Sequence, residues 1–202
     1  MLGVTRSSSR FTALTVTAVG LVATLALAAA PAAGQAAPAS PERDAMIRSA
    51  TSAAPAEISA EAAVRDWEGH VLREGSNGWT CLPDMPDRPG NSPMCLDDVW
   101  MRWADAWMNR KPYGADRIGF GYMLQGDMPT SNVDPYGESP TPDNQWIEDS
   151  GPHVMILVPD AATLEGLPRT PHEKGPWVMW DGTSYVHIMV PIPAGPRPAR
   201  KG

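Results

Sequence analysis

The sequence predicts an α+β fold: a single domain with a mainly antiparallel sheet, one Trp-rich amphipathic helix packed on one face, and a short N-terminal helix. Two observations carry this prediction. Segments with alternating apolar residues recur in the second half of the chain, and one strong helical stripe precedes them. The chain has 202 residues, which is enough for one domain with a substantial core.

Residues 1–36 have the features of a secretory signal peptide. Two arginines and no acidic residue precede an uncharged run of Ala, Leu, Val and Thr, and the small residues Gly34 and Ala36 predict cleavage near Ala36. We therefore expect an exported protein, periplasmic or secreted, with no membrane association after cleavage. The run is long enough to span a bilayer, so an uncleaved anchor is the alternative.

The charge of the chain excludes two classes of partner. The formal net charge is −7, and removal of the signal peptide takes away two of the 16 basic side chains and none of the 23 acidic ones. An acidic protein is poorly suited to bind nucleic acid or an anionic membrane surface. A small molecule or a metal ion fits better, and a protein partner is left open.

Cys81 and Cys95 are the only two cysteines. An even number of cysteines in an oxidising compartment predicts one disulfide. Their separation is much longer than the Cys-x-x-Cys spacing of redox sites, so we interpret the bond as structural.

The first half of the mature chain predicts a short helix, three strands and one long helix. Ser40 and Pro41 have the residue types of an N-cap and a first helical position, and the linker with its short helix covers residues 37–61. The α+β domain is predicted over residues 62–191. Within it, residues 63–66, 70–74 and 79–82 predict a β-meander.

The long helix is predicted over residues 97–110. Trp100, Trp103 and Trp107 share one apolar stripe, and acidic residues begin the segment while basic residues end it. Tryptophans at this spacing are more typical of packing than of a ligand platform. We therefore expect this helix to pack on the Val/Ile face of the sheet.

Three strands are predicted over residues 117–125, 152–159 and 184–191, and each has two different faces. One face carries Val, Ile, Leu and aromatic residues, and the other carries His, Met and Gly. Residues 177–190 predict a hairpin around the turn at Asp181 and Gly182. The long segment 126–151 is expected to cover one end of the sheet, and residues 192–202 to form a disordered basic tail.

The His/Met face is the most unusual chemical feature of the sequence. Imidazole and thioether groups together favour copper ions. If the strands are neighbours, the candidate metal ligands come together. They are His153, Met155, His187, Met189 and Met123, with Met179 as a further candidate.

A small-molecule site on the same face is a related hypothesis. Gly119 and Gly121 would leave room above the sheet, and Gln125 and Tyr185 would line the hollow.

The preferred function is therefore a non-catalytic module that binds a small ligand or a soft metal such as copper. The first alternative is a structural or protein-interaction domain, because methionine fills ordinary cores and a strand histidine often only packs. The second is a hydrolase-like enzyme with an unrecognised site. The sequence has no Gly-x-Ser-x-Gly elbow, His-Glu-x-x-His motif or P-loop.

Overall fold

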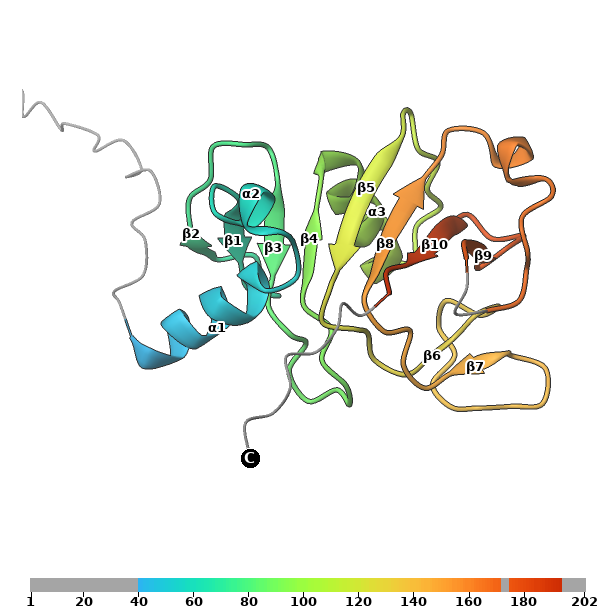
Figure 1. Cartoon of the computed structure of the whole chain (residues 1–202), viewed down its shortest axis with the longest axis horizontal. Coiled ribbons are helices and arrows are strands. Elements are labelled where there is room, and N and C mark those ends of the chain that lie inside the picture. Colours follow the sequence, from blue (N-terminus) through green and yellow to red (C-terminus); the bar gives the residue numbers. More distant parts are fainter. Residues whose placement is uncertain (1–39, 172–174, 194–202) are drawn as a thin grey trace, which may run out of the picture. The chain divides into compact units, whose positions relative to one another are not determined.

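The computed structural model describes residues 40–171 and 175–193, which belong to one compact unit. The predicted signal peptide and the predicted tail from residue 194 onward lie outside the described residues. Within these residues the fold is α+β, as predicted, with an eight-stranded, mostly antiparallel sheet and a separate two-stranded one (Figure 1). The strand order in the large sheet is β2-β1-β3-β4-β5-β8-β10-β9.

In chain order, the elements are α1 (Pro41–Thr51), α2 (Ala56–Ser59), β1 (Ala63–Arg65), β2 (Val71–Arg73), β3 (Thr80–Leu82), β4 (Met94–Leu96), α3 (Asp98–Met108), β5 (Gly119–Met123), β6 (Thr130–Ser131), β7 (Trp146–Ile147), β8 (His153–Leu157), the 3-10 helix η1 (Ala161–Leu164), β9 (Trp177–Met179) and β10 (His187–Pro191). No helix in the described ranges is long and apolar enough to cross a membrane.

Helix α1 begins where the sequence predicts and packs on the first strands of the sheet. The Ser40 side chain accepts a hydrogen bond from the backbone N–H of Arg43 (3.1 Å), and Pro41 opens the helix. Ala50 and Ala53 are fully buried in a cluster with Val64 of β1. The N-terminal helix is therefore part of the core of the domain.

The predicted β-meander is wrong in one pairing. Strand β1 pairs antiparallel with β2, but β3 lies on the other side of β1 and runs parallel to it, with Val64 opposite Cys81. The connection from β2 to β3 passes very close to β1 at Gly75, where an added Cβ atom would lie 2.0 Å from the backbone nitrogen of Ala63. Only glycine fits such a close backbone approach.

The predicted disulfide is present between Cys81 and Cys95. The two residues are direct partners on the antiparallel strands β3 and β4, with their Cα atoms 4.0 Å apart. Both are fully buried in the cluster beneath α1. The bond thus cross-links two neighbouring strands of the sheet within the core of the domain.

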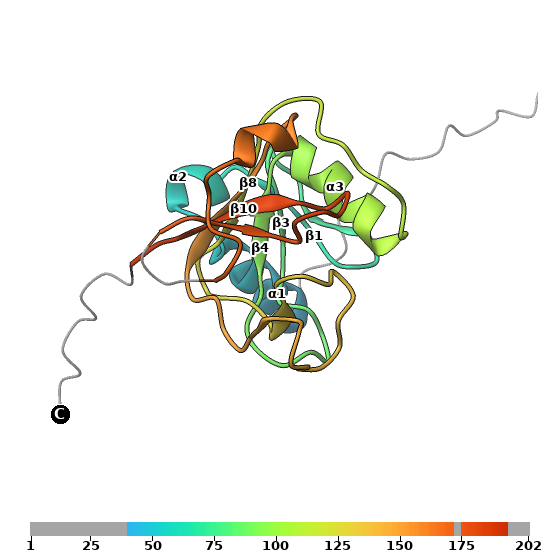
Figure 2. The same cartoon turned by 90° about the vertical axis from the view of Figure 1, so that its right-hand side faces the viewer.

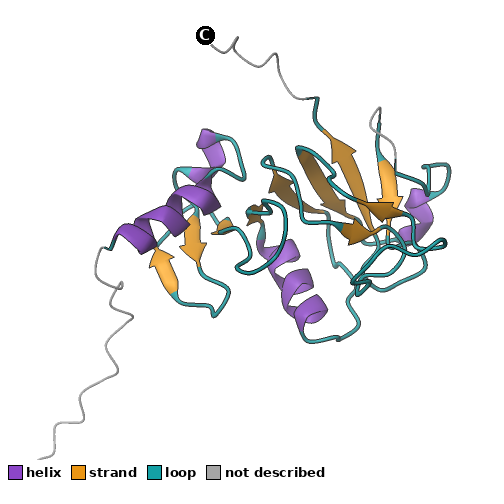
Figure 3. Ribbon diagram, turned by 90° about the horizontal axis from the view of Figure 1, so that it is seen from below, coloured by secondary structure: helices purple, strands orange, loops and turns teal. Residues whose placement is uncertain are grey.

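Helix α3 forms as predicted and lies against one face of the sheet (Figures 2 and 3). That face is the one opposite to the predicted Val/Ile face. A Cβ atom at Gly119 would lie 2.7 Å from Cβ of Val99 on the helix. Phe120, on the other face of β5, is 42% exposed, and Ile118, just before the strand, is 54% exposed. The expectation that the helix packs on the Val/Ile face is therefore wrong, because the glycine-bearing face is the one that admits a helix at short distance.

The long segment 126–151 is held in place by tryptophan side chains. The indole N–H groups of Trp107, Trp177 and Trp180 each donate a hydrogen bond to it, at 2.7 to 3.0 Å. The acceptors are the Pro135 carbonyl, the Asn132 side chain and the Ser131 carbonyl. These bonds fix the segment, with its strands β6 and β7, beside the end of the sheet that carries β9 (Figure 1).

Candidate functional site

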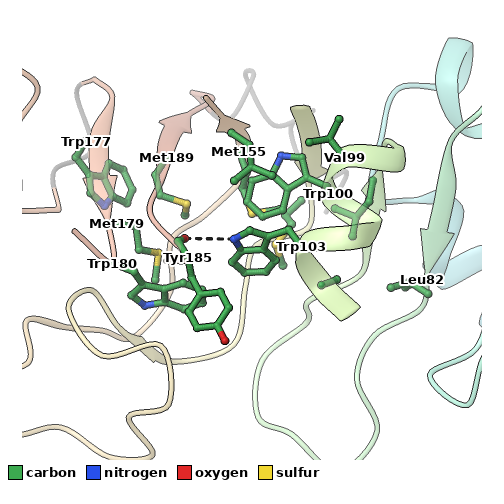
Figure 4. Close-up of a cluster of buried hydrophobic side chains, with 14 residues drawn as sticks. Leu82, Val99, Trp100, Trp103, Met155, Trp177, Met179, Trp180, Tyr185 and Met189 are labelled. Carbon is green, nitrogen blue, oxygen red and sulfur yellow. Dashed lines mark hydrogen bonds between the residues drawn. The ribbon is translucent and has the colours of Figure 1, made fainter. Parts of the chain in front are cut away.

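The strands that carry the His/Met face are neighbours in the sheet. Strand β8 pairs with β5 on one side and with β10 on the other, and Met155 lies directly opposite both Gly121 and Met189. Directly opposite residues of antiparallel strands have their Cβ atoms about 4.5–5.5 Å apart. The Met155 and Met189 side chains are therefore in direct reach of each other beneath α3, as Figure 4 shows.

The two histidines lie at opposite corners of this methionine pair. His187 faces Met179 on β9, whereas His153 faces Met123 on β5. The register thus sets each histidine beside a methionine of a different strand, and it keeps the two imidazoles from being direct partners.

Both histidines are held in the same way. Nδ1 of His153 lies 2.7 Å from the Gly151 carbonyl oxygen, and Nδ1 of His187 lies 2.9 Å from that of Tyr185. A carbonyl oxygen only accepts, so Nδ1 carries the hydrogen and Nε2 of the neutral ring carries the lone pair. Both rings are buried, and Nε2 of His153 has no hydrogen-bond partner among the residues that the structure describes.

Burial also keeps both imidazoles uncharged. It lowers the pKa of His153, and it lowers the pKa of His187 to about 4, with a smaller contribution from repulsion by His153. At neutral pH both rings therefore present an unprotonated nitrogen inside the protein.

A cavity of about 80 Å³ lies against this face, and methionine and tryptophan dominate its lining. Eight of the 11 methionines line it. Four belong to the sheet face: Met123, Met155, Met179 and Met189. The other four come from loops, from β4 and from the end of α3: Met85, Met94, Met108 and Met128.

His187 stands in this wall among three indole rings. Trp100, Trp103 and Trp180 each meet its ring nearly at right angles, with centroid distances of 5.2, 5.6 and 5.2 Å. The Trp103 indole N–H also donates to the Tyr185 carbonyl at 3.3 Å (Figure 4). His187 is consequently fixed in orientation by its neighbours and by its own hydrogen bond.

The candidate metal ligands are only partly brought together. His187, Met123, Met155 and Met189 line the same cavity, and so does Met179. His153 is buried on the same face, but it is outside the lining.

The candidate small-molecule residues do not gather into a pocket. The space above Gly119 and Gly121 is filled by α3 and its neighbours, since added Cβ atoms would meet Val99 and Leu96 within 3 Å. Gln125 is exposed, and its amide donates to the Ser52 carbonyl (2.9 Å). Tyr185 is buried, and its hydroxyl donates to the Lys111 carbonyl (2.8 Å). The glycines therefore provide helix packing and leave no hollow.

Asp127 lines the cavity but does not belong to the metal or small-molecule sites that the sequence predicts. Burial raises its pKa to about 7, and the nearby Asp149 carboxylate adds to this effect. Its Oδ1 accepts a hydrogen bond from the backbone N–H of Met128 (2.7 Å). Among the residues that line the cavity, Asp127 is therefore the one acidic group, and its charge changes near neutral pH in a mostly apolar wall.

One further cluster of polar groups lies at the turn between β1 and β2. Asp66, Glu68 and His70 offer ligand atoms within 4.8 Å of one another. Nδ1 of His70 pairs with Asp66 at 2.8 Å, which raises the pKa of the imidazole. The group is largely solvated, and an exposed ion pair of this kind is common at a turn without a metal.

No protein-family model, curated protein sequence or solved structure matches the chain. The functional conclusion therefore rests on the geometry of the described residues.

Proposed function

We propose that the chain is an exported, non-catalytic protein that binds a soft monovalent metal ion, Cu(I), in the methionine-lined cavity. One observation carries the proposal: His187 and the thioether residues Met155, Met179 and Met189 line the same cavity on one sheet face. Thioether sulfur and imidazole nitrogen are uncharged donors, and together they bind Cu(I) in preference to harder metal ions.

The orientation of His187 supports this function. Metal-binding histidines usually donate their second ring N–H to a carbonyl or carboxylate, which fixes the tautomer and the direction of the free nitrogen. The Tyr185 carbonyl takes this role for His187. The low pKa of the ring means that no proton has to leave before a metal binds.

The surroundings also suit a single positive charge. The faces and edges of three tryptophans surround His187, and aromatic faces attract cations that have lost water. Asp127 contributes a carboxyl group to the same lining. A monovalent ion therefore meets neutral donors and one ionisable acid, whereas a divalent ion would be left with little compensating charge.

The unfilled space distinguishes this arrangement from an ordinary methionine-rich core. Protein interiors are close-packed, with few voids larger than a water molecule. A volume of about 80 Å³ beside four methionines of one sheet face is enough for an ion and for movement of the flexible thioethers toward it.

The test is an anaerobic titration of the disulfide-bonded mature protein with Cu(I) in the presence of a competing Cu(I) chelator. We expect Met155→Leu/Met189→Leu to bind Cu(I) at least about 100-fold more weakly, because leucine keeps the volume and removes the sulfur. Met46→Leu is the matched control, since Met46 lies on α1 and packs against a different cluster.

Two results would overturn the proposal. One is the same Cu(I) affinity for the double variant and the wild type. The other is the absence of Cu(I) binding by the wild type, which would leave the His/Met face as core packing and favour the structural alternative. X-ray absorption of the loaded protein checks the ligands, and sulfur together with nitrogen is the expected shell.

A further inference from the structure

A second cavity, of about 300 Å³, adjoins the first and is nearer to the surface. The two share five lining residues: Met85, Trp107, Met108, Met128 and Thr130. The outer cavity thus leads toward the inner one along a common wall. The residues that line only the outer cavity are more polar than those of the inner one, because they include two arginines and a tyrosine.

Arg110 is placed in the outer cavity at the expense of backbone strain. It follows Asn109, the C-cap of α3, and has a φ of 53° in the left-handed region that glycine usually occupies after a helix. Its guanidinium carbon lies 4.0 Å from the centre of the Tyr136 ring. A strained backbone and a cation–π contact together hold this cation beside the cavity.

The aromatic wall below Arg110 is rigid. The Tyr136 ring stacks on Trp107, with centroids 6.0 Å apart and planes 5° from parallel. The Tyr136 hydroxyl donates to the Trp107 carbonyl (2.8 Å), and the Trp107 indole N–H donates to the Pro135 carbonyl (3.0 Å). Both rings are therefore fixed before any ligand arrives, which lowers the entropy cost of binding.

The cavity also has a surplus of positive charge in an acidic protein. Arg88 and Arg110 both line it, against one carboxylate, Glu138. Among the described residues, neither arginine forms an ion pair with a carboxylate. The guanidinium groups are thus available to an external anion, and arginine matches the geometry of a carboxylate with two parallel hydrogen bonds.

We propose that the outer cavity binds a small aromatic carboxylate. The ring of the ligand lies against Trp107 and the side chains of Met108 and Met128, and its carboxylate faces Arg88 and Arg110. The volume of about 300 Å³ is at the lower end of the range for small-molecule pockets, which fits a ligand of one or two fused rings. This site is separate from the Cu(I) ligands of the sheet face.

Three probes of the same shape test the charge preference: 2-naphthoate, the neutral 2-naphthalenemethanol and the cationic 2-naphthylmethylamine. Titration calorimetry of the mature protein should give naphthoate at least about 10-fold tighter binding than the alcohol, and the amine the weakest. Arg88→Gln/Arg110→Gln should remove the preference for naphthoate. Arg117→Gln is the control, because Arg117 is exposed and pairs with Asp98 outside the cavity.

The proposal is wrong if the three probes bind equally well, if none binds, or if the double arginine variant keeps the wild-type preference. A folded double variant is verified by its far-UV and near-UV circular dichroism. Met155→Leu/Met189→Leu should bind naphthoate as the wild type does. Failure of naphthoate binding and failure of Cu(I) binding are therefore distinguishable, since each has its own probe and its own variants.

Discussion

Asp97 and Phe120 are joined by two hydrogen bonds. The Asp97 backbone N–H donates to the Phe120 carbonyl at 3.1 Å, and the Phe120 N–H donates to the Asp97 carboxylate at 2.6 Å. The same carboxylate accepts from the backbone N–H of Trp100 at 2.9 Å and so caps α3. One side chain therefore fastens the helix to the strand that it covers.

Replacement of Asp97 should destabilise the folded protein. We expect Asp97→Ala to lower the free energy of unfolding by about 2 kcal/mol, since it removes a helix cap and leaves the Phe120 N–H without its acceptor. Chemical unfolding followed by tryptophan fluorescence measures the change. Asp98→Ala is the control, because the Asp98 side chain is exposed and forms solvent-exposed ion pairs with Arg102 and Arg117. Equal losses for the two variants would contradict the role of Asp97.

The close contact between α3 and β5 gives a second prediction. Gly119→Ala should lower the free energy of unfolding by about 1–3 kcal/mol, because the new methyl group would overlap the Val99 side chain. Gly114→Ala tests the same substitution where nothing lies within 4 Å of the added atom. We expect it to leave stability unchanged or slightly raised. If both variants lose the same stability, close packing at Gly119 is not the cause.

Asp127 predicts a pH dependence of stability. Its folded pKa is about 7 and its ordinary value is 3.8, so between these values the unfolded chain has released a proton that the folded chain retains. The contribution of this group to stability therefore decreases as the pH rises from about 4 to about 7. Asp127→Asn cannot ionise and keeps an oxygen for the Met128 N–H.

The asparagine variant should be more stable than the wild type at pH 8 by about 1–2 kcal/mol, a figure reduced for the partial exposure of the side chain. At pH 4 the two proteins should be nearly equal in stability. Urea unfolding at both pH values measures the difference. A difference that does not change with pH would show that ionisation of Asp127 has no part in it.

The disulfide gives a fourth prediction. Cys81→Ala/Cys95→Ala should lower the free energy of unfolding by about 3 kcal/mol, the value expected for a loop of this length. A reducing agent added to the folded protein should act slowly, because both sulfur atoms lie beneath α1. Thiol labelling with and without denaturant measures this protection. Rapid reduction of the folded protein would contradict the burial of the bond.

Alternation along the strands correctly predicted which residues share a face, but it did not predict which face the helix covers. Val, Ile and Phe favoured one side by hydrophobicity, yet Phe120 is 42% exposed. The decisive residues are Gly119 and Gly121, because the absence of side chains lets α3 approach the sheet. Glycine in a strand signals close approach as well as empty space, and the sequence alone does not distinguish the two.

The sequence predicts the part of the cavity lining that depends on strand periodicity, but not the part that depends on loops. His187, Met155 and Met189 follow a period of two, so their common face was visible in the sequence. Met85 and Met128 reach the cavity from segments without any period. Their positions depend on long-range contacts, such as the tryptophan hydrogen bonds that fix the segment 126–151.

The methionine lining also determines how the protein would respond to peroxide. Met108, 52% exposed at the surface, would be oxidised before the fully buried Met189. Each sulfoxide places a polar S=O group in an apolar wall and replaces a soft sulfur donor by a hard oxygen. Oxidative damage would therefore advance from the surface inward, and reductive repair of the sulfoxides would restore the original wall.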